Sequence, residues 1–277
     1  MDAFSTLMTQ QALSGTQNLQ AKSHVTYTLY DLSHNLSSHG TIGMLPKASS
    51  PSMNSVSLYP TITIFESHDL LAAGGTTGFR TWEAALHMGN YLCNHPEIVR
   101  AKRILELGSG TAYLSILCAL HLKASHVLTT DGSTSVISSH NYNFGINQLQ
   151  YPNQIRSELL VWGQSINCAK QYPEFFNGNM IDLILGADVI YDNAGISELI
   201  VTISDLFSTF PNANVLIAST VRNEETFRMF FKNCLQKKWL LSEIRWKLKY
   251  ENIQQGPFFD SAVPIKIVSI GMLRSSI

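Results

Sequence analysis

The chain has 277 residues, of which 45% are hydrophobic and 14% are charged, which is enough for one large domain with a sizeable core. Its 19 Lys and Arg residues nearly balance its 20 Asp and Glu residues, so net charge gives no reason to expect nucleic-acid binding. No stretch approaches the roughly 18 apolar residues of a membrane span, and no basic residue precedes the apolar positions of residues 1–13, unlike a secretory signal. We therefore expect a soluble, cytoplasmic protein.

The cysteines are far apart and form no CxxC pair: Cys93, Cys118, Cys168 and Cys234. This spacing disfavours a disulfide framework or a zinc cluster and favours a reducing compartment. We expect no bound metal.

Residues 1–60 differ in composition from the rest of the chain. Ser and Thr are scattered through this segment, and its charged residues are Asp2, Lys22, Asp31 and Lys47. The run 47–57 is typical of a loop, and we expect 41–57 to be poorly ordered. Segment 25–32 fits a short strand or a short helix, and its pattern does not decide between them. We assign 1–60 to a partly disordered N-terminal extension and 61–277 to the main domain.

From residue 61 onward, strand and helix patterns alternate. The predicted strands are 61–65, 104–107, 126–130, 156–162, 180–190 and 215–220, and the predicted helices are 82–92, 111–122, 136–149, 196–210 and 224–237. Two consecutive strands, 241–250 and 265–273, close the chain. This alternation predicts a parallel sheet covered by helices on both faces, with an antiparallel pair at one side.

The strongest local signal is the segment 104–114, ILELGSGTAYL. A buried strand ends at Gly108 and a helix begins near Thr111, so the turn between them presents backbone N–H groups to a ligand. A GxG turn alone also suits a dinucleotide enzyme. However, Tyr113 occupies the place of the third glycine of GxGxxG, and Glu106 would repel a pyrophosphate. Both details favour a ligand with an amino group and a sulfonium charge.

Polar residues follow two further predicted strands. Asp131 lies about 20 residues beyond the glycine turn, where a carboxylate can accept hydrogen bonds from ribose hydroxyls; helix capping is the alternative. Asp188 and Tyr191 lie near the end of the strand at 180–190. Because the carboxyl ends of parallel strands line the ligand crevice, we expect both side chains to face a ligand. The alternative is that Tyr191 packs internally and Asp188 caps a helix.

Residues 62–272 resemble the seven-strand, S-adenosylmethionine-dependent methyltransferases. Four segments narrow the resemblance: GTTGFRTWEAA at 75–85, VWG at 161–163, ADVIY at 187–191 and TVRNEETF at 220–227. The set is similar to the DxxY group of eukaryotic protein-lysine methyltransferases, and within that group to the elongation factor 2 lysine methyltransferases. The resemblance implies a Rossmann-like, doubly wound α/β fold with a seven-stranded, mostly parallel sheet and an antiparallel hairpin at its C-terminal end.

The resemblance also implies a cofactor site for S-adenosylmethionine. Glu106, Gly108 and Gly110 would hold the methionine part of the cofactor, and Asp131 would hold its ribose.

Aromatic and small residues would complete that site. Trp162 would border the adenine, Ala187 would contact the cofactor, and Trp82 would help to close the pocket, with a core position on its helix as the alternative for Trp82. Asp188 and Tyr191 would shape the channel that admits the target lysine. For Arg222 and Asn223, just past the strand at 215–220, helix capping with a surface charge and a substrate contact both remain open.

Methyl transfer to an amine needs a neutral nucleophile held in line with the donor methyl group. A free lysine has a pKa of about 10.4, so keeping it neutral at pH 7 costs about 4.6 kcal/mol. Desolvation and the sulfonium charge lower this pKa. Asp188 would capture and orient the ammonium rather than remove its proton, and Tyr191 offers a hydrogen bond and a π face for a partly methylated product.

The expected partner is a protein substrate, elongation factor 2, bound by a monomeric enzyme without direct contact to nucleic acid or membrane. Other readings remain open. A nucleic acid or a small molecule is an alternative substrate, although enzymes that methylate nucleic-acid amino groups typically carry an Asn/Asp-Pro-Pro-aromatic turn and residues 188–191 contain no proline. A non-catalytic interaction module would have no need of the intact cofactor motif. A dehydrogenase would bind nicotinamide.

Overall fold

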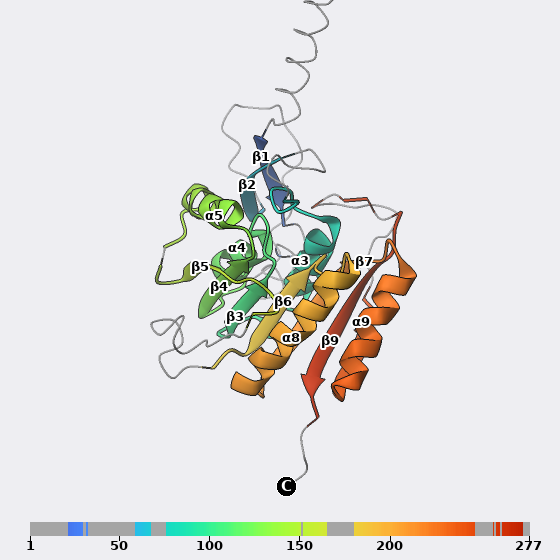
Figure 1. The fold of residues 1–277 in the computed structure, drawn as a ribbon. Helices are drawn as coiled ribbons and strands as arrows, with labels where there is room; N and C mark the ends of the chain where they lie inside the picture. The colour runs from blue at the N-terminus through green and yellow to red at the C-terminus, as the bar shows by residue number, and fades with distance from the viewer. Residues whose placement is uncertain are drawn as a thin grey trace, which may run out of the picture.

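A computed structural model of the chain describes residues 22–29, 32, 59–67, 76–150, 152–164, 180–246, 257, 259–260 and 262–273. The loop expected at 41–57, the first residue of the segment at 75–85 and Cys168 lie outside the described residues. The described residues form two sheets and the helices that cover them (Figure 1).

The larger sheet has seven strands in the order β5-β4-β3-β6-β7-β9-β8. The strands from β5 to β7 in this order are parallel to one another, and β9 is antiparallel to both of its neighbours. Their bounds are β3 Arg103–Leu107, β4 His126–Asp131, β5 Ile155–Leu159, β6 Leu183–Ala187, β7 Asn214–Thr220, β8 Trp239–Ile244 and β9 Ile265–Met272. The predicted fold class, including the antiparallel C-terminal pair, is confirmed.

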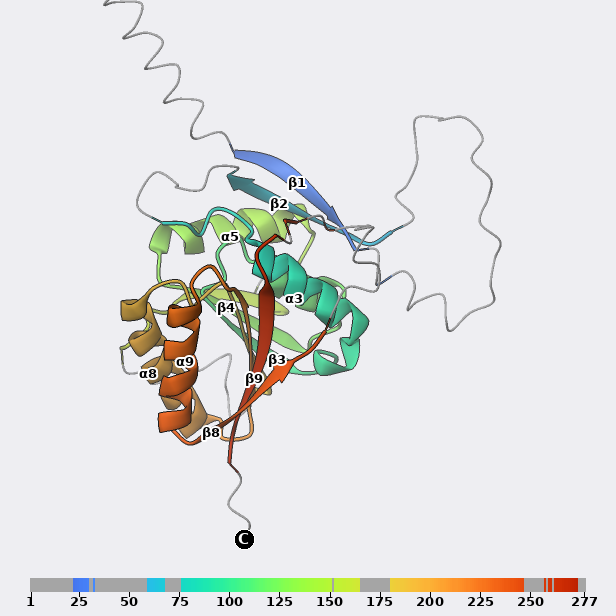
Figure 2. The ribbon, with the colours of Figure 1, turned by 90° about the vertical axis from the view of Figure 1, so that its right-hand side faces the viewer.

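Helices cover both faces of this sheet, as Figure 2 shows. Side chains of α3, α4 and α5 pack in one hydrophobic cluster, and those of α8 and α9 pack in the other on the opposite face. The helix bounds are α3 Glu83–Asn94, α4 Tyr113–Leu120, α5 Thr134–Ile146, α8 Asn193–Thr209 and α9 Glu224–Gln236, with a short 3-10 helix at Pro96–Ile98.

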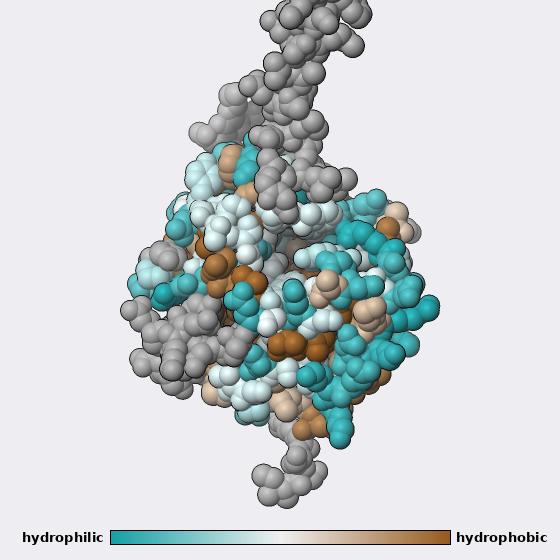
Figure 3. All heavy atoms as spheres, viewed as in Figure 1, coloured by the Kyte–Doolittle hydropathy of each residue, from teal (hydrophilic) through white to brown (hydrophobic). Residues whose placement is uncertain are grey.

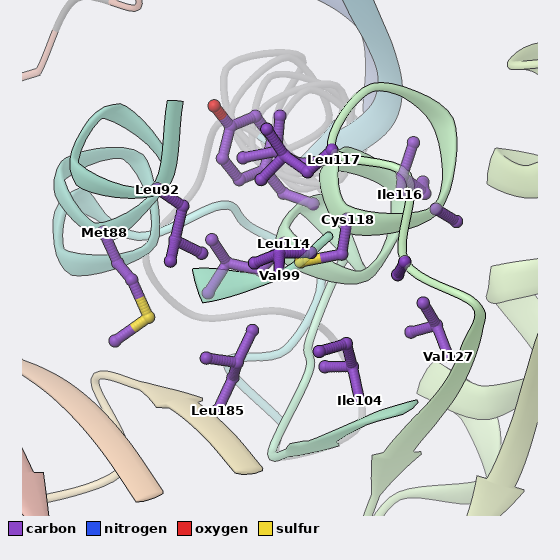
Figure 4. Packing of buried hydrophobic residues seen from close by; sticks show 14 of the residues in the cluster. Met88, Leu92, Val99, Ile104, Leu114, Ile116, Leu117, Cys118, Val127 and Leu185 are labelled. Carbon is purple, nitrogen blue, oxygen red and sulfur yellow. The ribbon is translucent and has the colours of Figure 1, made fainter. Parts of the chain in front are cut away.

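The first of these clusters lies between α3, α4 and the middle strands of the sheet (Figure 4). Met88 and Leu92 of α3 and Leu117 of α4 are completely buried, as are Ile104 of β3 and Leu185 of β6. Burial of each such side chain contributes about 1.5–3 kcal/mol. The cluster therefore holds α3 and α4 against the start of β3, and Leu105 and Leu107 at the end of the strand pack in the cluster on the opposite face.

Several predicted element ends shift because single residues leave the regular backbone. β6 ends at Ala187, not near residue 190, because Asp188 has a positive φ of 52°. α4 begins at Tyr113 because Ala112 adopts a left-handed conformation, with φ 65°. α8 begins at Asn193, three residues earlier than predicted, because Asp192 caps it by accepting a hydrogen bond from Gly195 N.

Tyr113 fits in the place of a third glycine because α3 makes room for it. The side chain of Tyr113 is buried, and a Cβ atom on Gly89 of α3 would lie 2.8 Å from its Cε1. The glycine that usually permits close packing in this motif is thus replaced here by a glycine on the facing helix.

The smaller sheet pairs β1 (Lys22–Thr28) with β2 (Thr61–Ser67) in antiparallel. Residues 25–28 of the segment that fitted strand or helix are therefore a strand, and residues 30 and 31 lie outside the described residues. Figure 2 shows this sheet beside α5. Asn143 of α5 and Asn147, the C-cap residue of that helix, bind one edge of β2: Asn147 accepts from Thr63 N and donates to Thr63 O, at 3.0 and 2.7 Å, and Asn143 accepts from Phe65 N at 2.9 Å. These bonds satisfy edge groups that would otherwise be unpaired and fix the sheet on the helix.

The surface over α9 is mainly hydrophilic in the view of Figure 3. Phe227, Phe230 and Cys234 are buried, whereas Arg228 and Lys232 are exposed, as expected for a helix with one apolar face. Among the described residues, no helix is long and apolar enough to cross a bilayer.

Candidate active site

The glycine turn after β3 has a backbone that only glycine adopts easily. Gly108 and Gly110 have φ values of 60° and 53°. A Cβ atom on Gly108 would lie 3.0 Å from both Trp162 and Val189, and one on Gly110 would lie 3.2 Å from Gly78 O. The turn therefore needs both the left-handed conformation and the absence of a side chain.

Asp131, the last residue of β4, holds the glycine turn in place. Its Oδ2 accepts a hydrogen bond from Gly110 N and its Oδ1 accepts one from Ser133 N, both at 3.0 Å. Burial raises the pKa of this carboxyl, and the backbone N–H donors act in the opposite direction. Because a carboxylate offers about four acceptor positions, Asp131 retains capacity for a ligand.

Glu106 lies within β3 and is only 2% exposed. Its Oε2 accepts hydrogen bonds from both the backbone N–H and the hydroxyl of Ser115, in the first turn of α4. Burial raises its pKa to about 8, although the Ser115 donors favour the ionised form. The side chain borders a narrow cavity of about 30 Å³ between the glycine turn and the start of α3.

A larger cavity of about 530 Å³ opens at the carboxyl ends of β3, β4 and β6. Eight of the nine candidate residues line it: Trp82, Gly108, Gly110, Asp131, Trp162, Ala187, Asp188 and Tyr191. The ninth, Glu106, borders the narrow cavity, which shares Trp82, Gly108, Gly110 and Ala187 with the larger one. The two cavities are therefore adjacent parts of one site.

Asp188 is tied to the end of the neighbouring strand β7. Its Oδ1 accepts from Thr220 N at 2.8 Å, and its Oδ2 accepts from Thr220 Oγ1 at 3.0 Å and from Arg222 at 3.3 Å. Burial raises the pKa of Asp188, and the Thr220 N–H and the Arg222 charge oppose this shift. Tyr191, by contrast, is 64% exposed and does not pack internally.

Trp82 stands beside two arginines. Its ring centre lies 5.0 Å from the Arg80 guanidinium and 5.1 Å from that of Arg222. Glu83 joins the two cations, at 2.9 Å from Arg80 and 3.3 Å from Arg222. Trp82 lines the cavity and is not a core residue of α3, and Arg222 is an ion-pair partner of Asp188 and not an isolated surface charge. Nothing in the sequence pattern placed these side chains together.

Asn223 and His140 have structural roles next to the site. Asn223 caps α9, because its Oδ1 accepts hydrogen bonds from Glu225 N and Thr226 N. His140 of α5 was missed in the sequence: it is completely buried and lies 2.7 Å from Gly110 O and 2.6 Å from Ser157 Oγ. Burial lowers its pKa to about 4, so His140 is neutral and holds the glycine turn through its contact with Gly110 O.

The charge of the larger cavity suits a cationic ligand. Its lining includes the carboxylates of Asp131, Asp188 and Glu198, and among its described lining residues there is no lysine or arginine; Arg80, which is paired with Glu83, borders the adjoining narrow cavity. The glycine turn leaves the space that a side chain would fill. A carboxylate-rich cavity beside such a turn fits the amino group and sulfonium of the expected cofactor, and it disfavours a pyrophosphate.

A family model described as lysine methyltransferase matches residues 64–237. Protein-lysine N-methyltransferase EFM3 of Chaetomium thermophilum is 36% identical over 270 residues, which span 98% of this chain and 74% of that protein. EEF1A lysine methyltransferase 3 of Mus musculus is 28% identical over 165 residues, spanning 58% of this chain and 64% of that protein. Protein-lysine N-methyltransferase EEF2KMT of Homo sapiens is 26% identical over 181 residues, spanning 61% of this chain and 53% of that protein.

The family match covers more than half of the chain, and the Chaetomium protein matches nearly all of it. The chain therefore belongs to the lysine methyltransferase family and is an S-adenosylmethionine-dependent protein-lysine N-methyltransferase.

Proposed function

We propose that this enzyme methylates a lysine of translation elongation factor 2 in the cytoplasm, and that it acts as a monomer built on a methyltransferase domain at 61–277. The segment GTTGFRTWEAA, whose described part borders the cavity, and the name of the human relative EEF2KMT support this substrate. A second candidate is elongation factor 1A, because the name of the mouse relative specifies that protein.

The observation that carries the proposal is the carboxylate-rich lining of the cavity. Both reactants, the sulfonium donor and the lysine ammonium, arrive with positive charge. Asp131, Asp188 and Glu198 provide a negative potential for them, and such a potential raises the local concentration of cations. A nucleic-acid substrate would instead meet carboxylates where its phosphates need cations.

In the proposed cofactor site, Asp131 accepts the ribose hydroxyls while it continues to hold the glycine turn. Glu106, Gly108 and Gly110, which line the narrow cavity, would hold the methionine part, and the carboxylate of Glu106 would attract its amino group. A cationic amino group beside Glu106 favours its ionised form, although burial raises its pKa to about 8 in the free protein.

The remaining contacts enclose the donor. Trp162, which would touch any side chain added at Gly108, would border the adenine. Ala187, at the end of β6, would contact the cofactor, and Trp82 would help to close the pocket from the α3 side. Because this tryptophan is flanked by two ion-paired arginines, its ring is held in place before the cofactor binds.

The bound cofactor supplies an electrophilic methyl group. In the proposed mechanism Asp188 orients the lysine through an acceptor position that its three contacts to Thr220 and Arg222 leave open. The positive charge of Arg222 moderates the tendency of Asp188 to keep the lysine protonated. Tyr191 presents an exposed phenol and ring face to the amine at the cavity mouth. Water accepts the proton that the lysine ammonium must lose before the methyl group is transferred.

The decisive test incubates the enzyme and labelled cofactor with purified elongation factor 2 and, in parallel, with purified elongation factor 1A. We expect label on a lysine of elongation factor 2 alone. Label on elongation factor 1A alone would replace the first substrate with the second, and an unlabelled pair would refute both. Asp131→Asn, which keeps one side-chain oxygen but removes the charge and one of the acceptors for Gly110 N and Ser133 N, provides the control with weakened cofactor binding. The molar mass of the purified enzyme, measured by light scattering, tests whether it is a monomer.

A further inference from the structure

The strand β1 contacts a segment that lines the larger cavity. β1 precedes the residues that the family model matches, which begin at 64. It pairs with β2, and together these strands contact residues 76–81, which we call the cavity-wall loop because Thr76, Thr77 and Gly78 line the cavity. The family match alone therefore gives no role to β1.

Three contacts fix the cavity-wall loop to the small sheet. Ser67 N donates to Phe79 O at 2.7 Å, and Thr81 N donates to Glu66 Oε2 at 2.8 Å. The ammonium of Lys22 on β1 lies 3.5 Å from the ring centre of Phe79, a short cation–π distance. The loop is thus bound to both strands and not only to the helix that follows it.

The other side of the cavity-wall loop packs on the glycine turn. A Cβ atom on Gly110 would lie 3.2 Å from Gly78 O, and the hydroxyl groups of Thr81 and Thr111 are 2.7 Å apart. The loop and the turn are thus in contact, and both line the same cavity. A small displacement of the loop therefore changes the shape of the cavity where the donor would bind.

Tyr27 completes this arrangement from β1. Its hydroxyl donates to Glu66 Oε1, and its ring meets that of Tyr113, in the first turn of α4, edge to face with centroids 5.2 Å apart. Glu66 is only 5% exposed, so its carboxylate depends on its donors, the Tyr27 hydroxyl and Thr81 N. Burial and the Glu66 charge raise the pKa of Tyr27, which keeps the phenol protonated and able to donate.

We propose that Tyr27 and Glu66 are positioning residues for the methyl donor: they hold the cavity-wall loop at the distance from the glycine turn that the donor requires. This proposal rests on the assignment of the cavity as the donor site. It gives β1 a function in cofactor binding that is separate from the stability of the fold, and it makes cofactor affinity sensitive to a residue that touches no ligand.

The test substitutes Tyr27→Phe, which removes one hydroxyl and keeps the ring packed on Tyr113. Loss of a hydrogen bond to a buried charge leaves the carboxylate underpaired, and we expect the KM for the cofactor to rise about tenfold, or about 1.4 kcal/mol. The kcat at saturating cofactor should change less than about twofold. The matched control is Tyr142→Phe, because the Tyr142 hydroxyl bonds His24 of the same strand at 3.1 Å, exposed to solvent. The control should keep its KM.

Equal KM values for wild type and Tyr27→Phe would overturn the proposal, as would a parallel loss of kcat and thermal stability, which indicates a purely structural role. If Tyr27→Phe does not fold, Lys22→Met replaces it, with the same expected split between KM and kcat. Calorimetric measurement of S-adenosylhomocysteine affinity in Asp131→Asn distinguishes failure of the donor site from failure of the positioning role. Unchanged affinity in Asp131→Asn would refute the donor site itself, whereas weakened affinity there with normal affinity in Tyr27→Phe would refute only the positioning role.

Discussion

Replacing Asp188 tests whether catalysis depends on its charge or on its hydrogen bonds. Alanine and asparagine at this position remove different contacts. Alanine removes the acceptors of Thr220 N, Thr220 Oγ1 and Arg222. Asparagine keeps a side-chain oxygen for Thr220 N and tolerates the positive φ of this position. The asparagine variant therefore removes the negative charge and the Arg222 ion pair but keeps the bond to the Thr220 backbone.

The expected cost of Asp188→Ala follows from two local terms. The N–H of Thr220, a residue only 7% exposed, loses its partner, which costs about 1–3 kcal/mol. A non-glycine residue without a stabilising side chain at φ 52° adds about 1–2 kcal/mol. The sum of about 2–5 kcal/mol lowers the Tm by roughly 4–20 °C, at roughly 2–4 °C per kcal/mol for a protein of this size. Any activity lost in Asp188→Ala therefore includes a loss of folded enzyme.

In Asp188→Asn we expect a Tm within a few degrees of wild type, cofactor affinity within about threefold, and a kcat lowered by about 10- to 150-fold. The last range corresponds to one hydrogen bond to a charged group, about 1.5–3 kcal/mol. Differential scanning calorimetry, titration with S-adenosylhomocysteine and single-turnover methylation measure the three quantities. Full kcat in Asp188→Asn would remove the charge from the mechanism, and an unchanged Tm in Asp188→Ala would contradict the bonding to Thr220.

Two further substitutions test the glycine turn and the buried acid. Gly108→Ala places a Cβ atom 3.0 Å from Trp162 at φ 60°; it should destabilise the fold by about 2–4 kcal/mol and weaken cofactor binding. Gly145→Ala, in α5 with no atom within 4 Å of the new Cβ, should keep or raise the Tm, and equal effects in both variants would contradict the packing argument. For Glu106, whose folded pKa is raised to about 8, the folded protein retains a proton that the unfolded chain releases above about pH 4.5, so its contribution to stability falls as pH rises from about 4.5 to 8. Urea unfolding of Glu106→Gln should lack this decline, and identical pH profiles for variant and wild type would show that Glu106 is already ionised in the folded state.

The elements that the sequence predicts correctly are those whose signal is local. The buried run at 104–107 and the glycines after it specify strand and turn within a few residues, and Asn223 marks the start of α9. Segment 25–32 gave no decision because β1 is half-covered and its pairing partner β2 lies far along the chain. The insertion of β9 between β7 and β8 depends on the same kind of distant pairing, which no local periodicity encodes.

The candidate site divides in the same way. The sequence predicts the positions of the glycine turn, Asp131 and Asp188 because each lies in a short motif at or near the end of a predicted strand. It does not predict their partners: Ser115 faces Glu106 from the next helix, Arg222 reaches Asp188 from beyond another strand, and His140 reaches the glycine turn from α5. Each of these contacts depends on tertiary packing, so only the structure shows which side chains share a cavity.

Four carboxyl groups in or beside the two cavities share one arrangement. Each accepts a hydrogen bond from the backbone N–H of a different segment, so each links two parts of the fold. The pairs are Glu66 with Thr81, Glu106 with Ser115, Asp131 with Gly110 and Asp188 with Thr220. Backbone donors favour the ionised form of these carboxyl groups and fix the acceptors before either substrate arrives, and Asp188 is in addition paired with Arg222. A cationic donor and a cationic lysine can then be oriented without ordering flexible side chains, a cost that a site built from exposed Asp and Glu residues would meet in every catalytic cycle.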